Sequence, residues 1–370
     1  MKWLSVFLLA VTSLIMAASC SDSGSTFTST PAPGGGGNAS VEWLIPEDEV
    51  LDGGPGKDGI PSIDNPLFVT ANNDEGKLDW LDNNDLILGI KIGEEIRGYP
   101  HPVLDWHEII NDDFDEMTSV AITYCPLTGT GIGWNRIIED KKTTFGVSGL
   151  LYNSNLMPYD RETDSYWSQM RLDCVHGERI EAAADLYQLV EIPWRLWKEW
   201  FPDAKVMAGD VFSNRPYDRY PYGNYRSQSG TLFPVDRSDD DRLHDKERVL
   251  GIINNDVALV FPFTSFKEQE VNVVIDEVDG EPIVIFGSGK LNFLTAYYTK
   301  LEDGTKVNDF LPVQNQNEVV AQDNNGNQWN IFGEAVAGPL KGQRLVPTNA
   351  FIGYWFTWPS FYQNTKIYGF

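Results

Sequence analysis

One pattern of thirteen residues occurs twice in this chain, 162 positions apart. Residues 88–100 and residues 250–262 both begin Leu-Gly-Ile and end in proline, and both predict a strand, a tight turn and a second strand. Trp167 and Trp329 are separated by the same 162 positions. Each copy then ends with a Gly-Glu pair, an aromatic helical segment and a short strand. The sequence therefore predicts two related halves.

Sheet predominates in the predicted fold. The predicted strands are rich in valine, isoleucine, tyrosine and phenylalanine, whereas the clearest helices are only residues 105–111 and 193–200. Pro193 suits the first turn of the second helix. We predict a sheet-rich α+β fold in which two degenerate halves, residues 41–209 and 249–370, pack as one compact unit. An irregular connector, residues 210–248, joins them, and long irregular loops in compact proteins are often functional.

The first nineteen residues have the pattern of a bacterial lipoprotein signal peptide. Lys2 supplies a positive charge, and the apolar run of residues 3–16 is short for a membrane span. Residues 16–20 (Met-Ala-Ala-Ser-Cys) resemble a lipobox, which implies that Cys20 is the lipidated first residue of the mature chain. Ala17 departs from the usual leucine or valine, and an ordinary signal peptide cut near Ala18 is the alternative.

The segment after the signal peptide predicts a flexible tether. Residues 20–40 are mainly serine, threonine, proline and glycine, a composition that buries little apolar surface. Ser21, directly after the cysteine, favours transfer to the outer membrane. We expect a cell-envelope protein that faces the periplasm and contacts the membrane through Cys20.

The charge balance excludes two classes of partner. The 54 acidic and 28 basic residues give a net charge of −26, which disfavours nucleic acid and direct adsorption on anionic lipid. The acid-rich segments 82–85 and 323–326 lack the pattern of an EF-hand loop, and we interpret them as turns. Protein partners cannot be named from these features.

A dense polar stretch marks the predicted site. Residues 124–169 combine one cysteine, Cys125, with many glycine, asparagine, aspartate, arginine and hydroxyl side chains. The second half contains neither cysteine nor histidine, whereas the first half contains Cys125 and His107. This asymmetry predicts that the functional site belongs to the first half.

Nine segments resemble one bacterial family, the domain of unknown function 3179. They span nearly the whole chain after the tether, and they are residues 57–61, 64–66, 106–112, 124–127, 129–131, 144–154, 159–161, 167–169 and 354–358. Thr128 stands where family members commonly have the second cysteine of Cys-Pro-Leu-Cys. The resemblance implies no activity, and Thr128 removes a Cys-x-x-Cys dithiol from this chain.

The sulfur and imidazole groups are compatible with a metal site. His107, Cys125, Cys174 and His176 are residue types that bind copper or zinc. Their spacing in the sequence follows no recognised zinc pattern. A structural disulfide between Cys125 and Cys174 is the alternative, because disulfides persist in an oxidising envelope.

Two further interpretations use the same region. In a cysteine-dependent enzyme, Cys125 would be the nucleophile and His107 the base, oriented by Asn111 or Asp160, with the Gly129–Gly131 turn facing an oxyanion. In a binding protein, polar side chains would line a pocket for a small ligand, and these are Asn111, Asn153, Asp160, Arg161, Trp167 and Gln169. The same polar residues are equally compatible with a hydrogen-bonded core network.

We therefore predict an envelope lipoprotein with one small-ligand or metal site in its first half. The alternatives are the cysteine-dependent enzyme and a purely structural lipoprotein. The reaction, the ligand and the oligomeric state are not determined by the sequence.

Overall fold

The computed structural model describes residues 42–209, 215–237, 239–267 and 269–369. The predicted signal peptide, the tether and the lipidated Cys20 lie outside the described residues. In the described part of the chain, no helix combines the length and the apolar character needed to cross a membrane.

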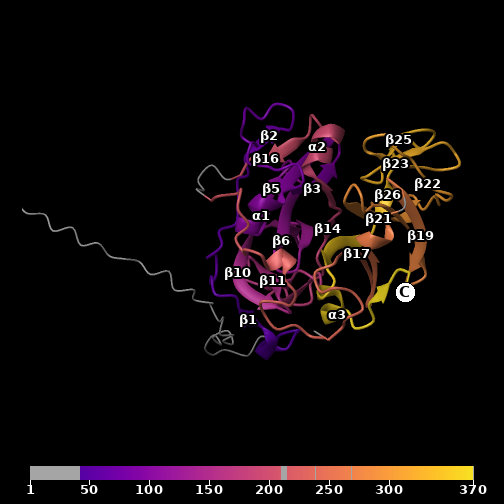
Figure 1. Cartoon of the computed structure of the whole chain (residues 1–370). Helices are drawn as coiled ribbons and strands as arrows, with labels where there is room; N and C mark the ends of the chain where they lie inside the picture. The colour runs from indigo at the N-terminus through magenta and orange to yellow at the C-terminus, as the bar shows by residue number, and fades with distance from the viewer. Residues whose placement is uncertain (1–41, 210–214, 238, 268, 370) are drawn as a thin grey trace, which may run out of the picture.

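The first half consists of three sheets (Figure 1). The first sheet has the order β15 (Val190–Pro193), β3 (Leu86–Ile92), β4 (Glu95–Pro100), β16 (Lys205–Met207) and β2 (Phe68–Thr70). The second has the order β14 (Leu186–Tyr187), β7 (Thr130–Asn135), β6 (Ser119–Cys125) and β5 (Ile109–Asp113). The third has the order β1 (Leu51–Asp52), β10 (Phe145–Tyr152), β11 (Asn155–Asp160), β12 (Tyr166–Ser168) and β13 (Asp173–His176). A short ribbon joins β8 (Ile137–Ile138) to β9 (Lys141–Lys142).

The second half contains three sheets with corresponding strand orders. The first is β27 (Asn349–Tyr354), β17 (Arg248–Asn254), β18 (Val257–Pro262) and β28 (Lys366–Ile367). The second is β26 (Leu345–Pro347), β21 (Phe293–Leu301), β20 (Glu281–Ser288) and β19 (Asn272–Val278). The third is β22 (Leu311–Pro312), β23 (Val319–Gln322), β24 (Gln328–Asn330) and β25 (Ala335–Ala337). In both halves a short strand of the first sheet runs parallel to the second strand of the central hairpin: β16 is parallel to β4, and β28 is parallel to β18.

Helices are few and short, as the sequence predicts. They are α1 (His101–His107), α2 (Trp194–Trp200) and α3 (Thr357–Phe361), with 3-10 turns at η1 (Glu47–Glu49), η2 (Tyr225–Ser227) and η3 (Phe263–Ser265). The sheet-rich α+β prediction is confirmed.

The first helix differs from its predicted position. We expected residues 105–111, but α1 ends at His107, and residues 109–113 form β5. Glu108 has a φ of 57°, a left-handed conformation that ends the helix. Ile109 and Ile110 are then fully buried against β6, so tertiary packing overrides the helical pattern.

In each half, a tryptophan ring from a helix packs directly against a glycine of the first sheet and holds that helix in place. A Cβ added to Gly89 of β3 would lie 2.4 Å from the Trp197 ring of α2, so this strand position requires glycine. In the second half, a Cβ on Gly251 of β17 would clash with the Trp358 ring of α3. The two leucine-glycine strands recognised in the sequence are therefore docking surfaces for tryptophan.

The two halves share their hydrophobic cores. One buried cluster combines Trp197 and Ile87 from the first half with Trp329 and Phe286 from the second. Another combines Trp167 with the C-terminal aromatic residues. In Figure 1 the indigo-to-magenta half and the orange-to-yellow half accordingly lie side by side. The shared cores make each half dependent on the other.

Candidate functional site

Segments from four of the family motifs meet at one small cavity in the first half. The cavity has a volume of about 60 Å³, and we call it the Glu108 cavity. Ile60, Glu108, Leu127 and Val147 come from four different segments that carry the family resemblance. The complete lining is Gly53, Pro55, Ile60, Glu108, Leu127, Val147, Gly149, Leu150, Leu151, Leu156, Tyr222 and Phe233.

Glu108 is the one carboxyl group among these lining residues. Its side chain is 7% exposed, and burial raises its pKa to about 7. The Tyr222 hydroxyl donates to Glu108 Oε1 at 3.1 Å, which opposes part of that rise. A carboxyl group near half-protonation at neutral pH can both donate and accept a hydrogen bond. Perturbed carboxyl groups of this kind are typical of functional sites.

The position of Glu108 follows from the end of α1. Its backbone N–H donates to the Leu104 carbonyl at 2.8 Å, and its left-handed φ of 57° turns the chain from the helix into β5. A residue other than glycine in this conformation is strained, and such strain is often found at functional sites.

The connector covers this cavity. Tyr222 and Phe233 supply part of its wall, and Tyr225 donates from its hydroxyl to the Leu127 carbonyl at 2.9 Å. Arg226 forms an ion pair with Asp105 of α1 at 2.6 Å, where burial raises the Asp105 pKa to about 6 against the opposing effect of the guanidinium. The described part of the connector is therefore an ordered cover on the first half.

Cys125 lies beside this site as a buried thiol. It is 1% exposed at the end of β6, with its sulfur 3.7 Å from the Ser154 carbonyl oxygen. Burial, followed by the charge of Glu108, raises its pKa to about 11. The thiol is therefore protonated at neutral pH, which is unfavourable for the predicted nucleophile.

His107 is engaged through both ring nitrogens. Nδ1 lies 2.8 Å from the Pro61 carbonyl oxygen, and Nε2 lies 2.9 Å from the Tyr217 hydroxyl. These contacts connect α1 to the N-terminal segment and to the connector. The geometry therefore assigns His107 a structural position instead of the base that the enzyme hypothesis requires.

The predicted metal set is not assembled. Cys174 is completely buried in β13, with its sulfur 3.3 Å from the Tyr166 carbonyl oxygen and its pKa raised to about 12 by burial. The His176 ring stacks on Trp43, with 4.1 Å between ring centroids. Within the described residues, no three His, Cys, Asp or Glu side chains form a group suited to a metal ion. The described residues therefore give the metal interpretation no support, and Cys125 and Cys174, although they share one hydrophobic cluster, lie on strands of different sheets.

The alternative disulfide is also absent. Cys125 and Cys174 are both unbridged thiols, one in the sheet of β5–β7 and the other in the sheet of β10–β13.

Gln169 belongs to a buried hydrogen-bond network. Its Oε1 accepts from the Thr130 hydroxyl at 2.6 Å and from Asn155 Nδ2 at 2.8 Å, and its Nε2 donates to the Thr123 hydroxyl at 2.9 Å. Thr128, at the family's second cysteine position, accepts from Asn155 Nδ2 at 2.9 Å. Many of the polar side chains after Cys125 therefore form hydrogen bonds with one another inside the core.

Asp160 and Trp167 form a structural pair that recurs in the second half. Asp160 is fully buried, accepts from Trp167 Nε1 at 3.0 Å and pairs with Arg179 at 2.8 Å. Asp323 accepts from Trp329 Nε1 at 3.2 Å in the corresponding hairpin. Because this arrangement occurs in both halves, we interpret it as hairpin architecture.

The other predicted ligand residues join separate elements. Asn111 Nδ2 donates to the Phe145 carbonyl at 2.8 Å, and its Oδ1 accepts from the Phe145 N–H at 2.9 Å. Asn153 Oδ1 accepts from the Asp236 N–H of the connector at 2.7 Å. Arg161 is exposed and donates to Asp58 at 2.9 Å. None of these three residues lines the Glu108 cavity.

Sequence reasoning missed Glu108 and Tyr222 as site residues. Glu108 was visible as a charged residue directly before the apolar pair Ile109-Ile110 of the segment 106–112. Tyr222 carried no comparable signal, since its contact with Glu108 spans 114 positions.

Comparison with known families matches residues 57–365 to the family described as "Protein of unknown function (DUF3179)". The chain belongs to the DUF3179 family. The resemblance carried by the nine sequence segments is thereby confirmed. Searches of curated proteins and of solved structures give no match to this DUF3179 protein.

Proposed function

We propose that this DUF3179 protein is a cell-envelope lipoprotein that binds a small molecule in the Glu108 cavity. The convergence of Ile60, Glu108, Leu127 and Val147, from four family segments, on one cavity is the observation that carries the proposal. Packing alone does not require a carboxyl group in an otherwise apolar wall, because burying it without a charged partner is unfavourable.

The lining defines the chemistry of the ligand. Apolar side chains supply most of the wall, and only Glu108 and Tyr222 contribute polar side-chain atoms. Ligand sites commonly combine such an apolar wall with a few polar groups that fix orientation. The proposed ligand therefore has a compact apolar body and one neutral hydrogen-bonding head.

Three isosteric probes test the cavity. Isobutyramide, isobutanol and isobutyrate share one apolar body and differ in their polar heads. By saturation-transfer NMR of the full chain, we expect the amide and the alcohol to bind, and isobutyrate to be excluded above pH 7, where the Glu108 carboxylate repels it. We expect Glu108→Leu to weaken amide binding at least about tenfold, since a hydrogen bond to a charged group is lost.

The matched control is Glu178→Gln, at an exposed position, which should leave binding unchanged. Absence of binding by all three probes, or undiminished binding in Glu108→Leu, would overturn the cavity proposal in favour of a structural role.

The envelope location is proposed from the leader. The short apolar run and the Met-Ala-Ala-Ser-Cys sequence ending at Cys20 support lipidation, and the tether of residues 20–40 supports separation of the folded unit from the membrane. A bioorthogonal palmitate label should be incorporated in bacterial cells and should be lost in Cys20→Ala. An unlabelled native chain, or a label that persists in Cys20→Ala, would refute this assignment.

A further inference from the structure

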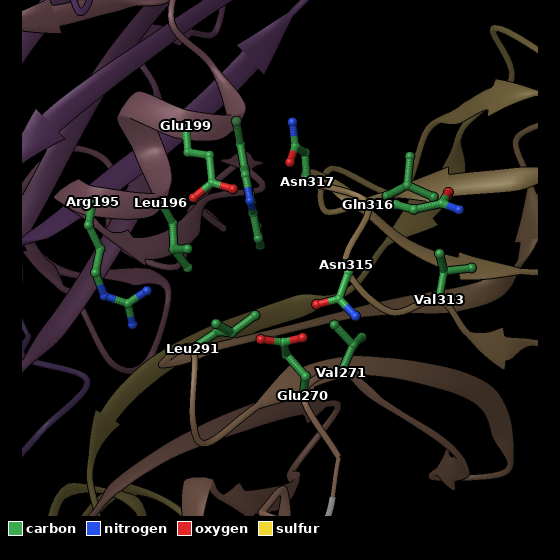
Figure 2. Close-up of a pocket in the computed structure, with 12 residues that line it drawn as sticks. Arg195, Leu196, Glu199, Glu270, Val271, Leu291, Val313, Asn315, Gln316 and Asn317 are labelled. Atoms are coloured by element: carbon green, nitrogen blue, oxygen red, sulfur yellow. The ribbon is translucent and has the colours of Figure 1, made fainter.

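A second cavity lies between the two halves, away from the Glu108 cavity. It has a volume of about 330 Å³ and lies between α2 of the first half and residues 270–271, 291 and 313–319 of the second. We call it the interhalf cleft (Figure 2). Its lining is Arg195, Leu196, Glu199, Trp200, Glu270, Val271, Leu291, Val313, Asn315, Gln316, Asn317 and Val319.

The apolar part of the interhalf cleft comes from both halves. Leu196 and Trp200 of α2 face Val271 and Leu291 of the second half across the same space. Trp200 is held edge-to-face against Phe293, with 5.8 Å between ring centroids. A ligand in the cleft would therefore contact a fixed apolar surface.

Six polar side chains surround this apolar surface, and all of them end in planar groups. Figure 2 shows the Glu199 carboxylate on one side and Glu270 and Asn315 on the other, with Arg195 at one end. The Glu270 carboxylate forms an ion pair with Lys290 at 3.8 Å. Within the described residues, the other five have no side-chain hydrogen bond or ion pair, and they are Arg195, Glu199, Asn315, Gln316 and Asn317.

The loop that carries the amides is held in place. Gln314 Oε1 accepts from the Val271 N–H at 2.9 Å, and Gln314 Nε2 donates to the Val271 carbonyl at 2.7 Å. Asn315 and Asn317 have φ values of 56° and 49°, conformations that asparagine tolerates better than most residues. The amide groups are therefore presented on a defined loop, which reduces the entropy lost on binding.

We propose that the interhalf cleft is a binding site for a small neutral sugar. Carboxylate, amide and guanidinium groups each present two adjacent polar atoms, which match two adjacent hydroxyl groups of a pyranose ring. The apolar surface with Trp200 fits the C–H face of the same ring. Two carboxylates against one guanidinium disfavour an anionic ligand. The volume lies at the lower end of the range of ligand sites and fits a mono- or disaccharide.

Saturation-transfer NMR with neutral monosaccharides and disaccharides tests this proposal. The full chain is purified in a detergent without a sugar headgroup, because alkyl glycosides would occupy the site. At least one sugar should bind, with transfer strongest at its C–H face. Glu270→Gln and Asn315→Ala should each weaken that binding about tenfold, since each removes hydrogen bonds to the ligand.

Asn325→Ala is the matched control, because Asn325 is exposed on a turn outside the cleft. Unchanged circular dichroism in the variants would show that the fold is intact. If no sugar binds, if sugar binding survives both cleft variants, or if free amino acids bind in place of sugars, the assignment is overturned. Because the cleft and the Glu108 cavity share no lining residue, the two proposals succeed or fail separately.

Discussion

Substitution of Asp160 should destabilise the protein more than the matching substitution of Asp323. Asp160 Oδ1 accepts from Arg179 at 2.8 Å and from the Thr163 N–H at 2.9 Å, while Oδ2 accepts from Trp167 Nε1. Asp323 likewise accepts from Trp329 Nε1 and from backbone N–H groups, but it forms no ion pair with any residue that the structure describes. The two carboxylates thus differ mainly by one buried guanidinium.

The expected magnitudes follow from that difference. Asparagine at either position replaces one acceptor oxygen with a donor, and an unsatisfied buried N–H costs about 1–3 kcal/mol. At position 160 it also removes the counter-charge of Arg179, whose side chain is only 2% exposed, and breaking such a pair costs about 3–5 kcal/mol. We expect a loss in the free energy of unfolding of roughly 2 kcal/mol for Asp323→Asn and roughly 6 kcal/mol for Asp160→Asn.

Urea unfolding of the full chain, followed by tryptophan fluorescence and by circular dichroism, measures both values. Coincident transitions would justify two-state treatment. Arg179→Met in the Asp160→Asn background should recover part of the loss, because it removes the uncompensated charge. Equal losses at positions 160 and 323, or no recovery in the double variant, would refute the explanation.

Three further predictions address pH, reactivity and packing. The Glu108 pKa of about 7 lies above the ordinary value of 4.5, so the folded state retains a proton that the unfolded state releases, and the free energy of unfolding should fall as pH rises from about 4.5 to about 7. The fall should total roughly 3 kcal/mol and should be absent in Glu108→Gln. If urea unfolding gives the same pH dependence for the native protein and for Glu108→Gln, the prediction is wrong. Because the Cys125 pKa is raised to about 11, iodoacetamide should label Cys125 at pH 7.5 at least about a hundredfold more slowly in the folded chain than in the urea-unfolded chain. Peptide mass spectrometry identifies the labelled cysteine. Rapid labelling of Cys125 in the folded protein would revive the nucleophile hypothesis. Gly251→Ala should lower the free energy of unfolding by about 2 kcal/mol because its Cβ meets the Trp358 ring, and a neutral effect in urea titration would show that the ring has room to move.

The sequence was most informative about local, periodic features. The paired strands at 88–100 and 250–262, the helix at 193–200 and the family segments all depend on neighbouring residues, and the structure contains them as β3–β4, β17–β18 and α2. The end of the first helix at Glu108 was not predicted, because a left-handed residue other than glycine has no clear sequence signature.

The candidate site was less predictable because polar residues look alike in a sequence whether they bind a ligand or each other. Gln169 and Asp160 suggested a pocket, yet Gln169 is hydrogen-bonded to Thr123 and Thr130 of the neighbouring sheet, and Asp160 is paired with Arg179 of a turn. The contact between Glu108 and Tyr222 depends on how the connector folds back over α1. Such long-range contacts are set by tertiary packing and not by local pattern.

The shared cores have a consequence for the order in which the chain acquires its structure. The core around Trp167 also contains Trp355, Trp358 and Ile367, which follow the first half in the chain. The first half is synthesised before these residues, so this core can be completed only after they have been added. A truncation before Trp355 should therefore disturb the Glu108 cavity, which shares Leu127, Val147 and Leu151 with this core and lies more than two hundred positions upstream.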